Sequence, residues 1–204
     1  VNYLEENKKK IRGLFVTHAH LDHIGAIPYV LTKIGDPPIY TMPLSAGLIK
    51  KRLEEFNLAS RARLHAIDKD ASIQLGSFKL EFFRLNHNIP DCIGLRIQTP
   101  VGNVIYATDW KFDHTPMDGL PTEFEKIARF GGEGVLLLMS DSTNALKPGY
   151  CVSEQELSKT IDRIFQDSKG RILFATFSQL ISRIQSVCDA AAKHNRKIVV
   201  TGRS

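Results

Sequence analysis

Along the first 150 residues, short apolar runs alternate with segments in which apolar residues recur every three or four positions, as they do on one face of a helix. Continuous or alternating apolar runs predict strands at 11–16, 39–42, 64–67, 78–85, 93–99, 104–108 and 134–140. The first and last of these runs are short and mostly apolar, which is typical of buried strands. Apolar positions three and four residues apart predict helices over 23–34 and from Pro43 to about Phe56. This first part is therefore expected to be an α/β unit.

The pattern changes after Pro148-Gly149. Ser153 and Glu156 form a Ser-x-x-Glu capping box, which predicts a helix running to about residue 167. A strand at 171–176, a helix at 179–194 and a strand at 197–201 follow, an order typical of a parallel sheet. We predict a domain boundary near residue 150, with one domain over 1–150 and a second over 151–204. Because the second is too short to bury a sheet on both faces, we expect the chain to be a fragment.

Composition narrows the class of protein. Its 204 residues are 43% hydrophobic and 24% charged, which is ordinary for a globular protein and excludes a disordered one. No apolar run approaches the roughly 18 residues that a membrane span needs. Three cysteines without a Cys-x-x-Cys pair exclude a disulfide framework and favour a reducing compartment, so we expect a cytoplasmic protein. The net charge of +5 is compatible with a polyanionic partner but does not establish one.

One segment carries the candidate chemistry. Three of the seven histidines lie within six residues, in the pattern His18-x-His20-x-Asp22-His23. Imidazole and carboxylate are ligands that suit zinc and similar divalent ions. At the end of strand 11–16, His18 and His20 would face one ion, and Asp22 and His23 a second ion nearby. A polar loop that only caps a helix does not need three imidazoles, so the segment predicts a metal site.

This motif resembles that of the metallo-β-lactamase superfamily. The resemblance implies an α/β fold, an αββα sandwich that holds one or two metals at strand ends. It also implies two further ligands downstream, a lone histidine and an aspartate that bridges the ions. His87 follows the strand predicted at 78–85, and Asp109 follows the strand at 104–108.

Further segments narrow the resemblance. Residues 86–91, 107–113, 140–145 with Pro148-Gly149, and 171–178 are similar to the ribonuclease J family, whose members insert a β-CASP domain into the lactamase fold. The resemblance covers nearly the whole chain and implies the beginning of that second domain after residue 150. The first strands of the sandwich and two later histidines of the family are missing from this sequence. It departs from the family at Thr108 (usually Gly), Trp110 (usually Phe) and Gln179-Leu180 (usually a small polar residue, then Asn).

The family resemblance implies a role for each candidate metal ligand and catalytic residue. His18, His20 and His87 would hold one divalent ion, Asp22 and His23 the second, with Asp109 bridging. Asp22, Asp109 and Asp141 are the expected catalytic residues, with Asp141 in the first acidic motif of β-CASP proteins. The Asp-Ser-Thr-Asn segment at 141–144 is equally rich in groups that bond local backbone, so a turn is the alternative for Asp141.

These assignments predict a metal-dependent ribonuclease, an exonuclease, an endonuclease or both. It would use two zinc or manganese ions and act on RNA, without membrane association; a homo-oligomer is left open. Two alternatives remain. One is a glyoxalase- or lactamase-type hydrolase of small molecules, against which the segment after residue 150 argues. The other is an RNA-binding homologue without turnover, against which an open two-ion ligand set argues, since structural zinc sites are closed.

Overall fold

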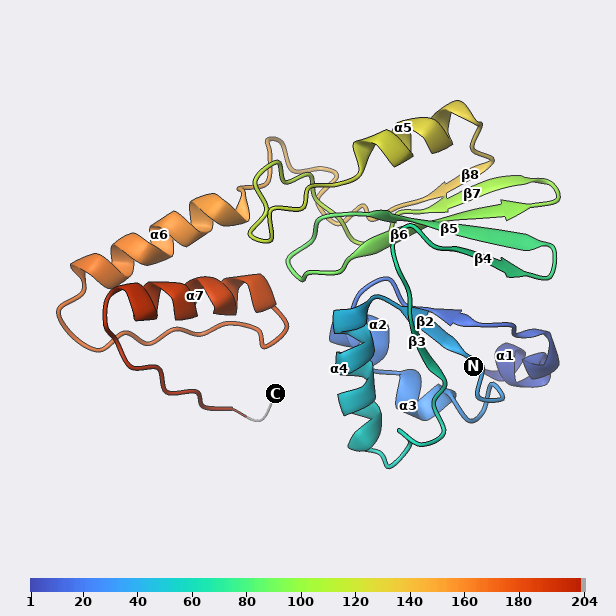
Figure 1. Ribbon diagram of the computed structural model, residues 1–204, viewed down its shortest axis with the longest axis horizontal. Helices are drawn as coiled ribbons and strands as arrows, with labels where there is room; N and C mark the ends of the chain where they lie inside the picture. The colour runs from blue at the N-terminus through green and yellow to red at the C-terminus, as the bar shows by residue number, and fades with distance from the viewer. Residues whose placement is uncertain (203–204) are drawn as a thin grey trace.

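Two β-sheets face each other, with helices on both outer sides (Figure 1). This computed structural model describes residues 1–202. The strands are β1 (Leu14–Phe15), β2 (Ile39–Thr41), β3 (Leu64–Ala66), β4 (Ser72–Leu75), β5 (Phe78–Arg84), β6 (Ile93–Thr99), β7 (Gly102–Tyr106) and β8 (Leu137–Met139). The helices are α1 (Asn2–Glu6), the 3-10 helix η1 (Lys8–Lys10), α2 (Leu21–Ile24), α3 (Ile27–Val30), α4 (Pro43–Glu54), α5 (Phe124–Gly132), α6 (Glu154–Asp167) and α7 (Ile181–Lys193). The predicted αββα layering is confirmed.

The two sheets differ in direction. In the first sheet, β1, β2 and β3 are parallel, and the connecting helices α2, α3 and α4 cover its outer face. In the second, β4 to β7 are antiparallel and β8 joins β7 in parallel. Because β5 and β7 both run antiparallel to β6, their carboxyl ends lie at the same edge of the sheet.

Three apolar clusters fill the layers. Between the sheets, Phe82 and Leu95 of the second sheet lie in one cluster with Tyr40 of the first sheet and with Met42, which follows β2. Beneath the first sheet, Val16 and Ile39 pack with residues of α3 and α4. Above the second sheet, Phe83 faces Phe130 of α5, with ring centroids 5.9 Å apart. Consecutive residues of β5 thus point into different clusters, as the alternation of a strand requires.

The prediction of one continuous helix over 23–34 is wrong. The structure has two short helices, α2 from Leu21 and α3 from Ile27, separated by Gly25 and Ala26. Pro28 lies in the first turn of α3 and has no N–H to donate to the carbonyl of Ile24, so one helix cannot run through it. The strand β4 was not predicted. It is a short edge strand with alternating exposure.

Three strand predictions at the end of the chain also differ from the structure. The run 134–140 forms a strand only over β8, whose three side chains are exposed instead of buried, because β8 lies at the sheet edge. In the described part of the chain, 171–176 and 197–201 form no strand. They run extended beside α7 and line an open cavity of about 690 Å³. A β-strand requires backbone hydrogen bonds to a neighbouring strand, and within residues 1–202 neither segment has such a neighbour.

Helices α6 and α7 pack against each other through Ile161, Phe165, Ala190 and Ala191. The predicted helix start at Ser153 is confirmed, since its Oγ accepts a hydrogen bond from the backbone N–H of Gln155 at 3.1 Å. The Glu156 carboxylate pairs with Lys159 instead of completing the reciprocal half of the capping box. Among the residues described, no helix combines the length and the apolar character needed to cross a membrane.

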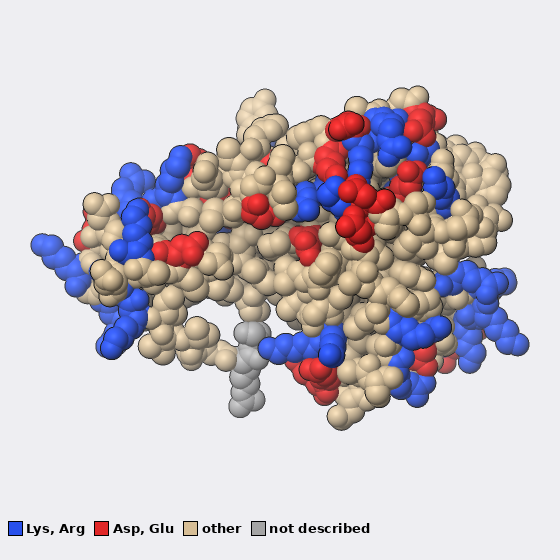
Figure 2. All heavy atoms as spheres, viewed as in Figure 1, with Lys and Arg blue, Asp and Glu red and all other residues tan. Residues whose placement is uncertain are grey.

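Charged side chains of both signs are interspersed over the visible face of the molecule (Figure 2). Basic residues gather at the end that carries α1 and η1, where Lys8, Lys9 and Lys10 are exposed. A surface on which both signs alternate does not by itself identify a polyanionic partner.

Candidate metal centre

The candidate ligands come from three loops that begin at strand ends. The loop of His18 and His20 follows β1, His87 follows β5, and Asp109 follows β7. Backbone hydrogen bonds hold these loops together. Ile93 N donates to Thr17 O at 3.1 Å, and Lys111 N donates to Asn86 O at 2.9 Å. Loops anchored to strands in this way can hold side chains with little freedom.

The first group of candidate ligands consists of three imidazoles and one carboxylate. Nδ1 of His20 lies 3.1 Å from Nε2 of His18 and 3.2 Å from Nε2 of His87. Oδ2 of Asp109 lies 3.9 Å from Nε2 of His18 and also from Nε2 of His87. Four ligands around a tetrahedral zinc ion at about 2.0–2.1 Å are about 3.3 Å apart. The residues present therefore fit a divalent ion.

Burial keeps these imidazoles neutral. Desolvation, reinforced by the neighbouring histidines, lowers the pKa of His18 to about 2. Burial likewise lowers the pKa of His87 to about 4 and shifts the pKa of His20 downward. Neutral imidazole is the form that binds a metal ion, because its ring nitrogen offers a lone pair. The group is thus prepared for a cation at neutral pH.

A second group shares a residue with the first. Nε2 of His23 lies 3.3 Å from Oδ2 of Asp109 and 3.6 Å from Oδ2 of Asp22. The Asp22 side chain is 78% exposed, so this group is open to solvent on one side. Asp109 belongs to both groups. Its carboxylate is placed where a bridging ligand would lie.

Asp141 lies beside the centre but belongs to neither group. Its backbone N–H donates to the carbonyl of Thr108 at 3.2 Å. Its Oδ1 accepts hydrogen bonds from the backbone N–H and the hydroxyl of Thr143, at 2.8 and 2.5 Å. These bonds lower the pKa of Asp141 and hold it in a local turn. The arrangement matches the turn alternative, and a catalytic role for Asp141 stays a prediction.

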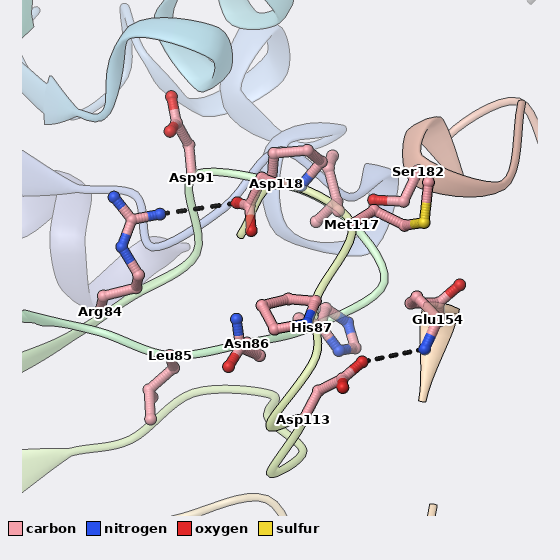
Figure 3. A pocket seen from close by; sticks show the side chains of 13 residues that line it. Arg84, Leu85, Asn86, His87, Asp91, Asp113, Met117, Asp118, Glu154 and Ser182 are labelled. Carbon is pink, nitrogen blue, oxygen red and sulfur yellow. Dashed lines mark hydrogen bonds and ion pairs between the residues drawn. The ribbon is translucent and has the colours of Figure 1, made fainter. Parts of the chain in front are cut away.

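A small pocket beside His87 contains charged residues for which the sequence predicted no role (Figure 3). Asp113 and Glu154 are buried and lie close together on its wall. The backbone N–H of Glu154 donates to Oδ2 of Asp113 at 2.9 Å. Nζ of Lys111 lies 2.8 Å from Glu154 and 3.5 Å from Asp113. Lys111 and Asp113 follow Asp109 closely in the chain, but no sequence pattern connects them to Glu154, some 40 residues later.

Gln179 links the region before α7 to the histidine loop. Its Oε1 accepts a hydrogen bond from the backbone N–H of Leu21 at 2.9 Å. The next helix supplies Ile181, which packs against the apolar cluster beneath β1. From sequence, Gln179 is a departure from a family pattern near the predicted domain junction, where an effect on substrate contacts was expected. Its position between two distant segments could not be found without the fold.

Comparisons with known proteins agree with this architecture. The family described as a beta-lactamase superfamily domain matches residues 2–137, and the one described as the beta-CASP domain of ribonuclease J matches residues 169–204. Ribonuclease J of Thermus thermophilus is 45% identical over 210 residues, covering 100% of this chain and 37% of that protein. Ribonuclease J of Synechocystis sp. is 42% identical over 205 residues, with 100% and 32% covered. The chain thus spans about a third of the length of these relatives.

A solved structure shows the same fold. A crystal structure of a protein of unknown function from Enterococcus faecalis V583 superposes with a TM-score of 0.64 and 19% identity. The match covers 87% of this chain and 44% of that one. At this identity the likeness concerns the fold alone, and together with the two family matches it confirms the predicted fold class.

Proposed function

The chain belongs to the β-lactamase superfamily and, within it, to the ribonuclease J family, and from that premise we propose that the protein is a metal-dependent ribonuclease. Its reaction would be hydrolysis of RNA phosphodiester bonds. The observation that carries this proposal is the convergence of His18, His20 and His87 on one point, with Asp109 shared by a second group. Relatives called ribonuclease J match along the whole chain and support RNA as the substrate class.

We assign two divalent ions, zinc or manganese, to this centre. His18, His20 and His87 would hold one ion, Asp22 and His23 the other, and Asp109 would bridge them. Nitrogen and oxygen ligands suit either metal. When bound, such ions supply a water acidic enough to attack at neutral pH and positive charge for the phosphoryl oxygens.

The chain's own residues contribute position and access. Burial of His18 fixes one ligand inside the protein, whereas the exposed Asp22 leaves the centre accessible to a large substrate. Asp22 can also accept a hydrogen bond from the attacking water and so orient it. A closed, four-coordinate site would favour a structural role, and the open second group favours catalysis instead.

We further propose the division of the chain into a metallo-β-lactamase domain over 1–150 and the beginning of a β-CASP domain over 151–204. The separate apolar cluster of α6 and α7 and the two family matches support it. Residues 203–204 of the second range lie outside the described residues. We place the protein in the cytoplasm, because its three free cysteines suit a reducing compartment.

One assay on the full-length protein tests this function. A 5′-phosphorylated RNA oligonucleotide and nitrocefin are offered to the protein with zinc or manganese and again after chelation. We expect metal-dependent cleavage of the RNA and no change in nitrocefin. Hydrolysis of nitrocefin alone would instead indicate a small-molecule hydrolase. Metal binding with neither reaction would indicate a homologue without turnover.

A further inference from the structure

Thr108 has an unusual backbone conformation next to the centre. It directly precedes Asp109, its side chain is buried, and its φ is +49°. A β-branched residue in the left-handed region is strained, because its Cβ crowds the backbone, whereas glycine takes this φ freely. Threonine at this position must therefore offer something that glycine lacks, and the candidate is its hydroxyl.

That hydroxyl begins a buried chain of hydrogen bonds. Oγ1 of Thr108 lies 2.8 Å from Oγ1 of Thr17, although 91 residues separate the two threonines. Oγ1 of Thr17 lies 3.2 Å from Nδ1 of His18. All three residues are buried, with exposed fractions of 0–4%. Water cannot easily replace a partner in such a setting, so each hydroxyl depends on the next.

The direction of these hydrogen bonds follows from the position of His18. The ring turns Nε2 toward the other imidazoles, at 3.1 Å from Nδ1 of His20. If Nε2 carries the lone pair, the neutral ring holds its proton on Nδ1 and donates it to Oγ1 of Thr17. The Thr17 hydroxyl can then donate its own hydrogen to Oγ1 of Thr108. Both threonines are thus oriented to stabilise one tautomer of His18.

We propose that Thr108 is a positioning residue that acts through Thr17 to hold the His18 imidazole with Nε2 free for a metal ion. Outer partners of this kind fix the tautomer and ring orientation of a ligating histidine. The inference rests on the proposed metal centre, but it concerns the affinity of the centre and not the substrate. It also explains why a strained residue is retained where glycine would fit the backbone better.

Three substitutions separate the hydroxyl from the backbone strain. Thr108→Gly removes both, Thr108→Val removes only the hydroxyl, and Thr108→Ser keeps the hydroxyl. In the full-length protein, zinc affinity is measured by competition with a chromogenic chelator, and the Tm of the metal-free protein by calorimetry. We expect Thr108→Gly to keep or raise the Tm while weakening zinc binding by about 10-fold or more. Thr108→Val should weaken zinc binding similarly, and Thr108→Ser should bind zinc like the unsubstituted protein.

The tautomer gives a readout that does not need metal. The ¹⁵N chemical shifts of the His18 ring in the metal-free protein should show the proton on Nδ1, and Thr108→Val should shift the population toward Nε2–H. Unchanged zinc affinity and tautomer in Thr108→Gly and Thr108→Val would overturn the assignment. So would a Thr108→Ser variant as weak as Thr108→Val. A protein that shows these effects but cleaves no RNA would instead refute only the proposed function.

Discussion

Oε1 of Gln179 accepts a hydrogen bond from the backbone N–H of Leu21, 158 residues away in the chain. Leu21 stands between His20 and Asp22, so the segment before α7 is attached directly to the loop of candidate ligands. A hydrogen bond of this kind contributes about 0.5–1.5 kcal/mol. A bond of this strength acts locally. It restrains the loop of candidate ligands and keeps the start of α7 next to that loop.

Gln179→Ala should loosen this contact without unfolding the protein. We expect faster hydrogen exchange at the Leu21 amide and a several-fold loss of RNA cleavage, because the loop between the candidate ligands gains freedom. Gln185→Ala is the matched control, since Gln185 is exposed on α7 and its side chain bonds to Asp189 within the helix. Equal exchange rates at Leu21 in both variants would show that the contact does not restrain the loop.

Glu154→Ala should destabilise the protein by about 2 kcal/mol. Removing one partner of a buried ion pair commonly costs about 3–5 kcal/mol, but Asp113 remains 3.5 Å from Lys111 and compensates in part. The free energy of unfolding is measured by urea denaturation. Glu156→Ala on the same helix removes an exposed carboxylate and should change stability little. If the two variants are equally stable, the buried cluster does not hold α6 in place.

Asp109→Ala should abolish RNA cleavage and lower the content of both metal ions, because this carboxylate belongs to both ligand groups. RNA affinity should change little, since it depends mainly on phosphate contacts spread over the surface. Metal content is measured by mass spectrometry, and RNA binding by fluorescence anisotropy. Asp167→Ala, at an exposed position at the end of α6, is the control. Near-normal cleavage by Asp109→Ala would refute the ligand assignment.

The metal-free protein should lose stability as the pH falls below about 6.5. In the unfolded chain, His18 and His87 bind protons near their ordinary pKa of 6.5, whereas in the fold their pKa values are about 2 and about 4. The unfolded state then holds more protons, so the free energy of unfolding decreases by up to about 1.4 kcal/mol per pH unit for each histidine. Unfolding in urea at several pH values measures the slope. His87→Gln should reduce it, and a flat profile in the unsubstituted protein would contradict the burial described.

Gly94→Ala and Gly47→Ala should have effects of opposite sign. A Cβ at Gly94 would overlap the ring of Phe83, so we expect a loss of about 1–3 kcal/mol. Gly47 lies in α4, where an added Cβ would meet no atom within 4 Å, and alanine there should stabilise the helix by up to about 1 kcal/mol. Thermal unfolding distinguishes the two. Destabilisation by both would indicate that the packing at β5 and β6 is not the cause.

The candidate ligands could be predicted from sequence because the His-x-His-x-Asp-His segment is itself typical of a metal site, and the resemblance to the metallo-β-lactamase superfamily implied a later histidine and aspartate at strand ends. His87 and Asp109 come directly after apolar runs, and the loop of His18 does so as well. The remaining site features depend on contacts between distant segments. The pairing of Lys111 with Glu154 and the hydroxyl contact of Thr17 with Thr108 have no local pattern. The strands predicted at 171–176 and 197–201 are wrong for the same reason. A strand needs a neighbouring strand to pair with, and the apolar pattern of one segment does not show whether that neighbour is present.

The consecutive residues Phe82 and Phe83 fix the register of β5 and so the position of the ligand that follows it. Each belongs to a different apolar cluster, so a slip of β5 by one residue would turn each ring toward the wrong layer. The same slip would carry His87 about 3.3 Å along the strand direction. That displacement is as large as the 3.2 Å between its Nε2 and Nδ1 of His20. The packing of Phe82 and Phe83 in two separate layers therefore fixes the register of β5, and with it the position of the His87 imidazole relative to the other candidate ligands.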